Sequence, residues 1–391
     1  NIYEGGTGND ILYGTAGSDT YRYNIGDGAD TIYEGYQNGN NTSVDKITLG
    51  AGITTADVVL FRAQGTSDLV ISFTTAGDQI KIPNWYNDNN NRIEQLVFAD
   101  GTIWDKAKLT ADGLVVTGTS ANDILNGLSS YNNTLVGMDG NDTLNGNNLA
   151  DTLIGGAGED VLSDTIGNNL FDAGMDNDTI TAGSGNDLLI GGLGNDVITT
   201  GTGYDVIVFN KGDGQDIINA STGADNTISL GGDFAYSDLS LTKSTNDLIL
   251  KVGATDQITL KDWYLGTSNK SVVNLQVIAE SMTAFSLGGA DALRDNKVEN
   301  FNFANMVAAF DAEGATANWQ LTDERLTAHL NAGSDTAAIG GDLAYQYGRN
   351  SNLTGMGLLN AQSVISAANF GQTAQTLNDP SVWQAEVVKL G

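Results

Sequence analysis

Apolar residues recur every nine positions through the middle of the chain, each two places after an acidic or amide residue. The apolar positions are Leu125, Leu135, Leu144, Leu153, Leu162, Phe171, Ile180, Leu189, Ile198 and Ile207. The acid or amide positions are Asp123, Asn133, Asp142, Asp151, Asp160, Asn169, Asp178, Asp187, Asp196 and Asp205, with Asp123 one residue out of step. A shorter run of the same pattern opens the chain, with Asp10 and Asp19 at the corresponding places.

One unit, Gly155 to Ser163, reads GGAGEDVLS. Its glycines allow positive φ angles, so its first six residues can form a tight turn. Its last three residues place an apolar side chain at the centre of a short strand, facing inward. Two units then make a coil of 18 residues, and stacked coils make a parallel β-roll. We therefore expect a mainly β fold with short strands of about three residues.

Stacked coils bring the aspartates into columns, because residues 18 apart occupy the same place in successive coils. A column of carboxylates repels itself unless cations lie between its members. Carboxylate and backbone carbonyl oxygens are hard ligands that suit Ca²⁺ better than Mg²⁺, which retains its water and demands octahedral geometry. The pattern therefore predicts calcium as the bound ion, and a glycine-rich solenoid or linker without metal is the alternative.

These units resemble the repeats-in-toxin (RTX) calcium-binding nonapeptide GGxGxDxUx, over residues 3–32 and 117–218. The resemblance implies a calcium-bound parallel β-roll, export by type I secretion, and an extracellular location, either secreted or on the cell surface. The candidate metal ligands are the acids Asp10, Asp19, Asp27, Asp30, Asp123, Asp142, Asp151, Asp160, Asp178, Asp187, Asp196, Asp205, Asp213 and Asp216. The turn glycines Gly155, Gly156, Gly158, Gly191, Gly192 and Gly194 join them as candidates.

The two edges of the second roll differ. The all-aspartate edge carries Asp123, Asp142, Asp160, Asp178 and Asp196. The asparagine edge carries Asn133, Asp151, Asn169, Asp187 and Asp205. Asparagine lacks the charge that favours Ca²⁺, and the turn beginning Asp164-Thr165-Ile166 lacks its leading glycine pair. We therefore expect fuller calcium occupancy on the all-aspartate edge.

Each run of repeats is followed by a similar segment. Residues 23–32 match 209–218, and residues 78–86 match 256–264 in the form DQIKIPNWY and DQITLKDWY. These segments resemble the haemolysin-type calcium-binding-related domain, although the second copy departs from the first at its end. The Trp-Tyr pairs are expected to cap the open end of each roll. Stacking on a sugar ring is the alternative for these aromatics.

The composition changes near residue 281, and the segments 305–310, 321–330 and 360–368 have helical character. Residues 334–348 resemble the ends of large RTX proteins, which implies an uncleaved type I export signal. A small α-rich assembly domain is the alternative. The expected domains are a roll end (1–32), a β segment related to calcium binding (33–116), a second roll (117–218), a second such β segment (219–281) and an α-rich C-terminal region (282–391).

The composition excludes several classes of partner, metal site and reaction. With 17 basic and 48 acidic residues the net charge is −31, which argues against nucleic acid as a partner. No cysteine and a single histidine exclude thiolate and multi-histidine metal sites. No apolar run is long enough for a transmembrane segment. No nucleophile elbow or phosphate loop is present, so we expect no catalytic residues and no enzyme activity.

The resulting prediction is a calcium-dependent folding and export module of a large type I-secreted protein with a structural role, as an adhesin, surface-layer or filament component. The alternative is a non-catalytic C-terminal module of a secreted RTX toxin, lipase or protease. The expected partners are calcium ions and the type I secretion machinery, with self-association or contact with a cell surface as a further expectation. Because the sequence opens inside a repeat, we also expect a longer parent chain.

Overall fold

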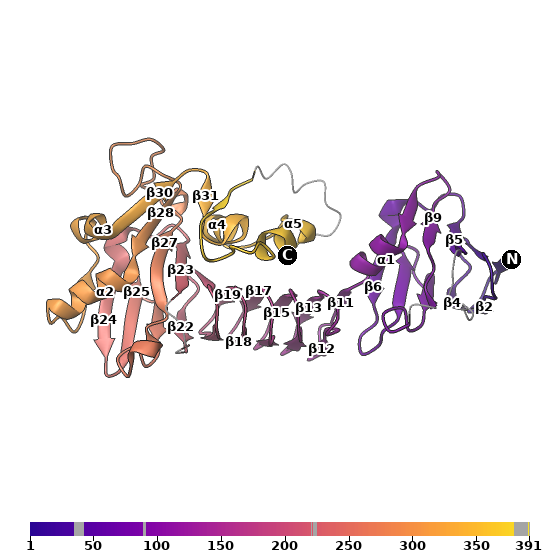
Figure 1. Ribbon diagram of the computed structural model, residues 1–391, viewed down its shortest axis with the longest axis horizontal. Helices are drawn as coiled ribbons and strands as arrows, with labels where there is room; N and C mark the ends of the chain where they lie inside the picture. Colours follow the sequence, from indigo (N-terminus) through magenta and orange to yellow (C-terminus); the bar gives the residue numbers. More distant parts are fainter. Residues whose placement is uncertain (35–42, 89–90, 220, 222–224, 379–389, 391) are drawn as a thin grey trace. The chain divides into compact units, whose positions relative to one another are not determined.

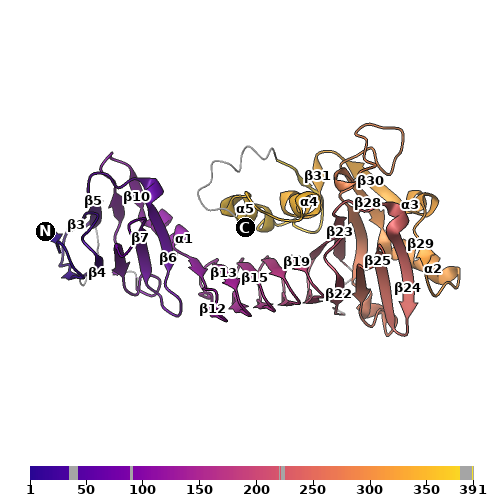
Figure 2. The same ribbon diagram turned by 180° about the vertical axis from the view of Figure 1, so that it is seen from behind.

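The computed structural model describes residues 1–34, 43–88, 91–219, 221, 225–378 and 390. The chain divides into two units, Asn1–Thr117 and Gly118–Gly391. Figures 1 and 2 show the second unit from opposite sides, with its short strands stacked like the rungs of a ladder.

The stacked strands of the second unit belong to two parallel sheets, which are joined by a turn at each edge. One sheet has the three-residue strands β12 (Ile124–Asn126), β14 (Thr143–Asn145), β16 (Val161–Ser163), β18 (Thr179–Thr181) and β20 (Val197–Thr199). The other has the six-residue strands β13 (Thr134–Asp139), β15 (Thr152–Ala157), β17 (Leu170–Met175) and β19 (Leu188–Leu193). The register advances by 18 residues from one long strand to the next, as in the pairing of Thr152 with Leu170. The predicted mainly β fold with a parallel β-roll is confirmed.

Strand length differs from the expectation of three residues on the long-stranded sheet. There the first residues of the following turn continue the parallel strand pairing, so Gly156 pairs with Gly174 and Gly174 with Gly192. A side chain at Gly174 would place its Cβ 2.1 Å from the Gly156 oxygen. Glycine is therefore required for this extended pairing, and the pairing lengthens each strand.

The interior of the roll is a column of apolar side chains from the eighth position of each unit. All ten predicted residues are buried, with at most 1% of their surface exposed. Because consecutive coils place these side chains against each other, each contributes the free energy of burying a large apolar group, roughly 1.5–3 kcal/mol. The nine-residue period thus encodes the core directly.

Beyond the repeats, both sheets continue as parallel strands and then become antiparallel. The parallel continuation consists of β21 (Val206–Asn210), β22 (Gln215–Ile218), β23 (Asn226–Gly231), β26 (Gln257–Leu260) and β27 (Val272–Val277). The antiparallel strands are β24 (Leu239–Ser244), β25 (Asp247–Val252), β28 (Val298–Asn302), β29 (Trp319–Gln320) and β30 (Leu330–Ser334). These hairpin-like additions cover the last coil, so its strands do not end at an open edge.

The first unit repeats this plan on a smaller scale. One sheet orders β1 (Ile2–Glu4), β3 (Thr20–Tyr23), β5 (Lys46–Leu49), β9 (Gln95–Val97) and the antiparallel β10 (Ile103–Asp105). The other orders β2 (Ile11–Tyr13), β4 (Ala29–Tyr33), β8 (Gln79–Ile82) and the antiparallel β7 (Leu69–Phe73) and β6 (Val58–Arg62). Helix α1 (Lys106–Asp112) and β11 (Val115–Thr117) complete the unit.

The tryptophans of the two Trp-Tyr pairs lie inside these end segments. Trp85 is fully buried and donates its indole N–H to the Thr110 hydroxyl at 3.2 Å. Trp263 is 2% exposed and meets the ring of Phe303 edge-on at 6.1 Å. A ring without an exposed face cannot stack on a sugar, so the burial of these indoles favours the capping interpretation.

The C-terminal region combines helices with the last strands. Its helices are α2 (Phe303–Ala312), α3 (Asp323–His329), α4 (Gly341–Asn350) and α5 (Leu358–Ile365), and β31 (Ala337–Ala338) pairs with β32 (Gln375–Thr376). Residues 379–389 and 391 of the expected C-terminal region lie outside the described residues. Within the described part of the chain, no helix has the length and apolar character needed to span a membrane.

Helix α4 packs against β21 and β23 on the outer face of the long-stranded sheet (Figures 1 and 2). The Asn210 side-chain amide donates to the Tyr347 carbonyl at 2.9 Å, and the Gly232 amide donates to the Gly348 carbonyl at 3.0 Å. Tyr347 is itself buried. The roll therefore supplies the surface on which this helix is ordered.

The inward column predicts a large cost for truncation at one of its positions. Leu162→Ala should lower the free energy of unfolding in saturating calcium by about 2–5 kcal/mol, because it leaves a cavity between two coils. Val161→Ala, at the neighbouring position that is 43% exposed, serves as the control and should cost less than about 1 kcal/mol. Denaturant unfolding followed by circular dichroism measures both, and equal losses would contradict the inward column.

Candidate metal sites

The aspartates of the all-aspartate edge tie successive coils together through one carboxylate oxygen each. The backbone N–H of each aspartate donates to the Oδ1 atom of the aspartate in the following coil. The donor and acceptor distances are 2.7 Å for Asp123 to Asp142, 2.7 Å for Asp142 to Asp160, 2.7 Å for Asp160 to Asp178, 2.8 Å for Asp178 to Asp196 and 3.1 Å for Asp196 to Asp216. We call this series of hydrogen bonds from a backbone N–H to the next carboxylate a ladder, and it holds the accepting carboxylates in the same orientation.

On both edges, seven stacked aspartates have a second carboxylate oxygen that is buried and has no hydrogen-bond partner among the described residues. This holds for the Oδ2 atoms of Asp142, Asp151, Asp160, Asp178, Asp187, Asp196 and Asp205. Burying a charged oxygen without a partner is costly, so a cation or a proton is needed at each place. A buried column of such oxygens is what a row of metal sites requires.

Glycine keeps the space beside each of these oxygens open. A Cβ at Gly155 would lie 2.4 Å from Asp160 Oδ2 and 2.4 Å from the Ala173 carbonyl oxygen of the next coil. A Cβ at Gly191 would likewise lie 2.3 Å from Asp196 Oδ2. Carboxylate and carbonyl oxygens therefore converge on one small space, and this donor set fits Ca²⁺.

The remaining candidate glycines shape the turn rather than the space beside the carboxylate. Gly156, Gly158, Gly192 and Gly194 have φ angles of 121°, 122°, 94° and 156°. A Cβ at Gly156 would also come within 1.8 Å of the Met138 carbonyl oxygen in the previous coil. These positions need glycine both for conformation and for the close approach of two backbones.

On the asparagine edge the ladder persists, but two amide groups replace carboxylates. The Asp151 N–H donates to Asn169 Oδ1 and the Asn169 N–H to Asp187 Oδ1, each at 2.7 Å. The Asn169 side-chain amide donates to the Gly167 carbonyl at 3.1 Å, and that of Asn133 donates to the Tyr131 carbonyl at 2.8 Å. Here the side-chain amide of each asparagine donates to a carbonyl oxygen of its turn, and weaker metal binding on this edge stays a prediction.

Burial sets the acidity of the stacked carboxyls. It raises the pKa of Asp178 to about 8, and the carboxylates of Asp196 and Asp160 add to the rise. Burial also raises the pKa of Asp160 and of Asp196 to about 6. Without a metal ion these groups would therefore hold protons at a pH where exposed aspartates are ionised.

The acids that end each run take two different positions. Asp30 and Asp216 extend the ladders, since their Oδ1 atoms accept from the N–H groups of Asp10 and Asp196 at 3.0 and 3.1 Å. Asp27 and Asp213 instead close their own turns by accepting from the N–H three residues earlier, at 2.7 Å in both turns. Burial raises the pKa of Asp213 to about 7 and that of Asp216 to about 9.

Sequence reasoning missed two acids of the duplicated segments. Asp78 accepts from the N–H groups of Gly26 and Gly28 at 2.8 and 3.1 Å, and Asp256 accepts from the Gly212 N–H at 2.9 Å. Both lie in the matched stretches that open with Asp-Gln-Ile, so the duplication was the signal that could have identified them. They connect each end segment to the last turn of its roll.

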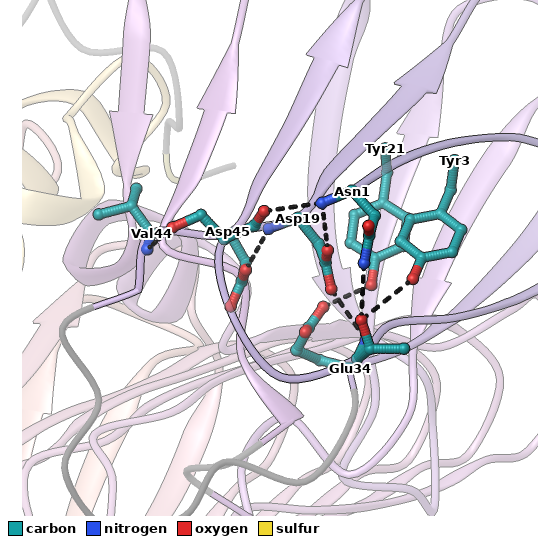
Figure 3. A network of polar contacts seen from close by, with 9 residues as sticks. Asn1, Tyr3, Asp19, Tyr21, Glu34, Val44 and Asp45 are labelled. Carbon is teal, nitrogen blue, oxygen red and sulfur yellow. Dashed lines mark hydrogen bonds and ion pairs between the residues drawn. The ribbon is translucent and has the colours of Figure 1, made fainter.

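The first unit contains a second ladder besides that of Asp10 and Asp30, and Figure 3 shows its members Asn1, Asp19 and Asp45. The backbone nitrogen of Asn1 donates to Asp19 Oδ1 at 2.7 Å. The Asp19 N–H then donates to Asp45 Oδ1 at 2.7 Å, and the Asp45 N–H donates to Glu94 Oε2 at 2.9 Å. Glu34 accepts from the Tyr21 hydroxyl at 2.5 Å. Oxygens of Asp19, Glu34 and Asp45 lie within 4.8 Å of one another, whereas the sequence singled out only Asp19.

Two family models match the chain. The model described as the RTX calcium-binding nonapeptide repeat (4 copies) matches residues 1–32, 117–153, 129–162, 145–180 and 172–207. The model described as the haemolysin-type calcium binding protein related domain matches residues 68–108. The first model covers the stacked acids from Asp123 to Asp205 and the acids of the opening run from Asp10 to Asp30, and the second covers Asp78.

Among curated proteins no match was found. Among solved structures, the chain is similar to the extracellular lipase LipA from Serratia marcescens, with 18% identity and a TM-score of 0.23. The similarity covers 70% of this chain and 40% of the lipase chain. The chain thus spans about two fifths of that protein's length, and a likeness of this size carries no argument about activity.

The shared ladder predicts that a single aspartate supports two adjacent sites. Asp160→Asn keeps the Oδ1 acceptor but places an amide where the unpartnered oxygen stood. At calcium ten times above the dissociation constant each site contributes about 1.4 kcal/mol, so this variant should lose about 3 kcal/mol and fold at a higher calcium concentration. Asp139→Asn, an exposed acid of the same roll, is the control. An unchanged calcium midpoint for Asp160→Asn, measured by circular dichroism, would refute the stacked sites.

The raised acidities predict opposite effects of pH with and without calcium. Their folded pKa values of about 6 and 8 lie above the usual value of 3.8, so the calcium-free roll binds more protons than the unfolded chain. Its stability should be fully present below about pH 4 and be lost as pH rises to about 8. Circular dichroism in EDTA should therefore show more β structure at pH 5 than at pH 8. With calcium present, protons compete with the ion, so the calcium midpoint should rise as pH falls. More β structure in EDTA at pH 8 than at pH 5 would contradict the first expectation, and a calcium midpoint that falls with falling pH would contradict the second.

Proposed function

We propose that this chain, which carries RTX calcium-binding nonapeptide repeats, is the calcium-dependent folding and export module of a large secreted protein, with a structural role. RTX repeat proteins are typically secreted by type I systems, so the proposed setting is extracellular. The proposal assigns no catalytic role to the chain.

The observation that carries the proposal is the column of buried, unpartnered carboxylate oxygens. The oxygens of Asp142 and Asp160 each share a small space with a carbonyl oxygen of the next coil, so an ion bound there would join two coils. Without ions the column is a stack of buried charges that opposes folding. A protein arranged in this way makes its fold conditional on a divalent cation.

Conditional folding suits export. Where calcium is scarce, as in a bacterial cytosol, the acidic repeats repel one another and the chain stays unfolded and narrow enough to be threaded. Outside the cell, calcium lies near the range of roughly 10⁻⁴–10⁻³ M in which extracellular modules bind it. Binding free energy then becomes folding free energy, and folding outside opposes backward movement.

The magnitudes are sufficient for such a switch. At ten times the dissociation constant each site contributes about 1.4 kcal/mol, so several sites reach about 5–10 kcal/mol. That range is comparable with the whole stability of an ordinary domain. About eight ions would also offset roughly half of the net charge of −31.

The C-terminal helices are tied to the same switch. Helix α4 takes its backbone partners from Asn210 and Gly232, next to the last turn of the second roll. An unfolded roll offers neither partner, so this region is free in low calcium and docked in high calcium. We assign it to engagement with the type I secretion machinery before folding, and to assembly or surface contact afterwards.

The way in which the acids are used supports the proposed structural role. The stacked aspartates are held in ladders between coils, and the interior is filled with apolar side chains. This arrangement makes a stiff spacer whose length grows with the number of repeats. We propose such a spacer in a surface-layer, adhesin or filament protein.

A calcium titration of the full chain from EDTA, followed by far-ultraviolet circular dichroism, tests the proposal. We expect a cooperative transition from coil to β structure at sub-millimolar to millimolar calcium, and no comparable transition with magnesium, which retains its water. Light scattering recorded in parallel should rise with folding if chains assemble. A chain already folded in EDTA at pH 8 would overturn the proposed switch.

A further inference from the structure

The asparagine edge contains an acid that the repeat pattern does not provide. Asp164 stands where the turn of the previous coil has Gly146, as the backbone contacts show. The Gly146 N–H donates to the Ser163 carbonyl, and the Asp164 N–H donates to the Thr181 carbonyl, each at 3.0 Å and each one coil further on. In the sequence alone, Asp164 is an aspartate at a turn position where the repeat pattern has glycine.

The side chain of Asp164 nevertheless points into the roll. It is only 3% exposed, and its Oδ1 atom accepts from the N–H groups of Thr165 and Ile166 at 2.6 and 3.0 Å. Its Oδ2 atom is buried and has no hydrogen-bond partner among the described residues. The turn thus fixes the orientation of the carboxylate and leaves one oxygen available.

That oxygen faces a second one of the same kind. Asp151 is fully buried, and its Oδ2 atom also lacks a partner within the described part of the chain. A Cβ placed on Gly146 would lie 2.1 Å from Asp164 Oδ2 and 2.6 Å from Asp151 Oδ2. Since Gly146 has no positive φ angle, space rather than conformation explains the glycine here.

Two buried carboxylates flanking one point require a positive charge between them. Burial raises the pKa of both groups, which reflects the same unmet need. The next acid position of this edge is Asn169, whose amide is directed to the Gly167 carbonyl and brings no charge. Asp164 therefore restores the negative charge that Asn169 removes, from a different place in the turn.

We propose that Asp151 and Asp164 hold a calcium ion between them, at a site formed by a substitution of the repeat rather than by its regular ligands. Two carboxylates balance the charge of one Ca²⁺, and both are hard oxygen donors. The asparagine edge then keeps a site at this coil, and its expected weakness is confined to the positions that lack such a replacement.

Counting bound ions in the folded full chain tests this site. Asp164→Asn should bind one calcium fewer than the wild type, by equilibrium dialysis and by native mass spectrometry. Asp139→Asn removes the same charge from an exposed place in the roll and should keep the wild-type count. The double variant Asp164→Asn with Asn169→Asp moves the carboxylate to its regular place and should regain the missing ion.

An unchanged count for Asp164→Asn would overturn the site. Infrared spectroscopy of the calcium-saturated wild type gives a test that needs no variant, since a protonated carboxyl band that Asp164→Asn removes would mean that the pair shares a proton instead. The two proposals fail separately. A wild type that folds in EDTA overturns the folding switch, whereas a normal calcium transition with an unchanged ion count overturns only this site.

Discussion

Each stacked aspartate binds the backbone of a neighbouring coil and also carries a charge that needs a partner, and the rest of the structure depends on these two roles. One oxygen accepts a backbone N–H from the neighbouring coil, as Asp160 does for Asp142, and so builds the solenoid. The other oxygen is buried and has no hydrogen-bond partner among the described residues, and in Asp142 and Asp160 it shares a small space with a carbonyl oxygen of the next coil. A geometry that stabilises the backbone therefore creates a charge that only a cation or a proton can satisfy. Calcium is in this sense part of the core.

The same reasoning explains how the rolls end. A solenoid of parallel strands exposes an edge at its last coil, and here both units cover it with antiparallel strands and buried aromatic rings. Asp78 and Asp256 link these end segments to the final turns through glycine N–H groups. In the second unit helix α4 packs on the outer face of the long-stranded sheet, where Asn210 and Gly232 bind its carbonyl oxygens. Folding of the ends is thereby coupled to folding of the repeats.

The two edges show how the arrangement tolerates change. An asparagine keeps the ladder, because its Oδ1 atom still accepts the N–H of the neighbouring coil, but its amide takes a turn carbonyl in place of an ion. The edge can thus lose a charge without losing its backbone order. Asp164 shows the converse, in which a residue outside the pattern brings a carboxylate back beside Asp151. Backbone regularity and metal content are separable in this fold.

The sequence by itself determined the roll, its apolar interior and the class of ion, because a nine-residue period places residues of one type in one column whatever lies elsewhere. Leu162 and Asp160 could be assigned from their place in a single unit. The tertiary structure decided what the period cannot express. Asp78 reaches Gly26 across 52 residues, Asn210 reaches Tyr347 across 137, and Asp164 turns inward at a position that the pattern reserves for glycine. Such contacts depend on which coils and ends are brought together by packing, and no local spacing records that.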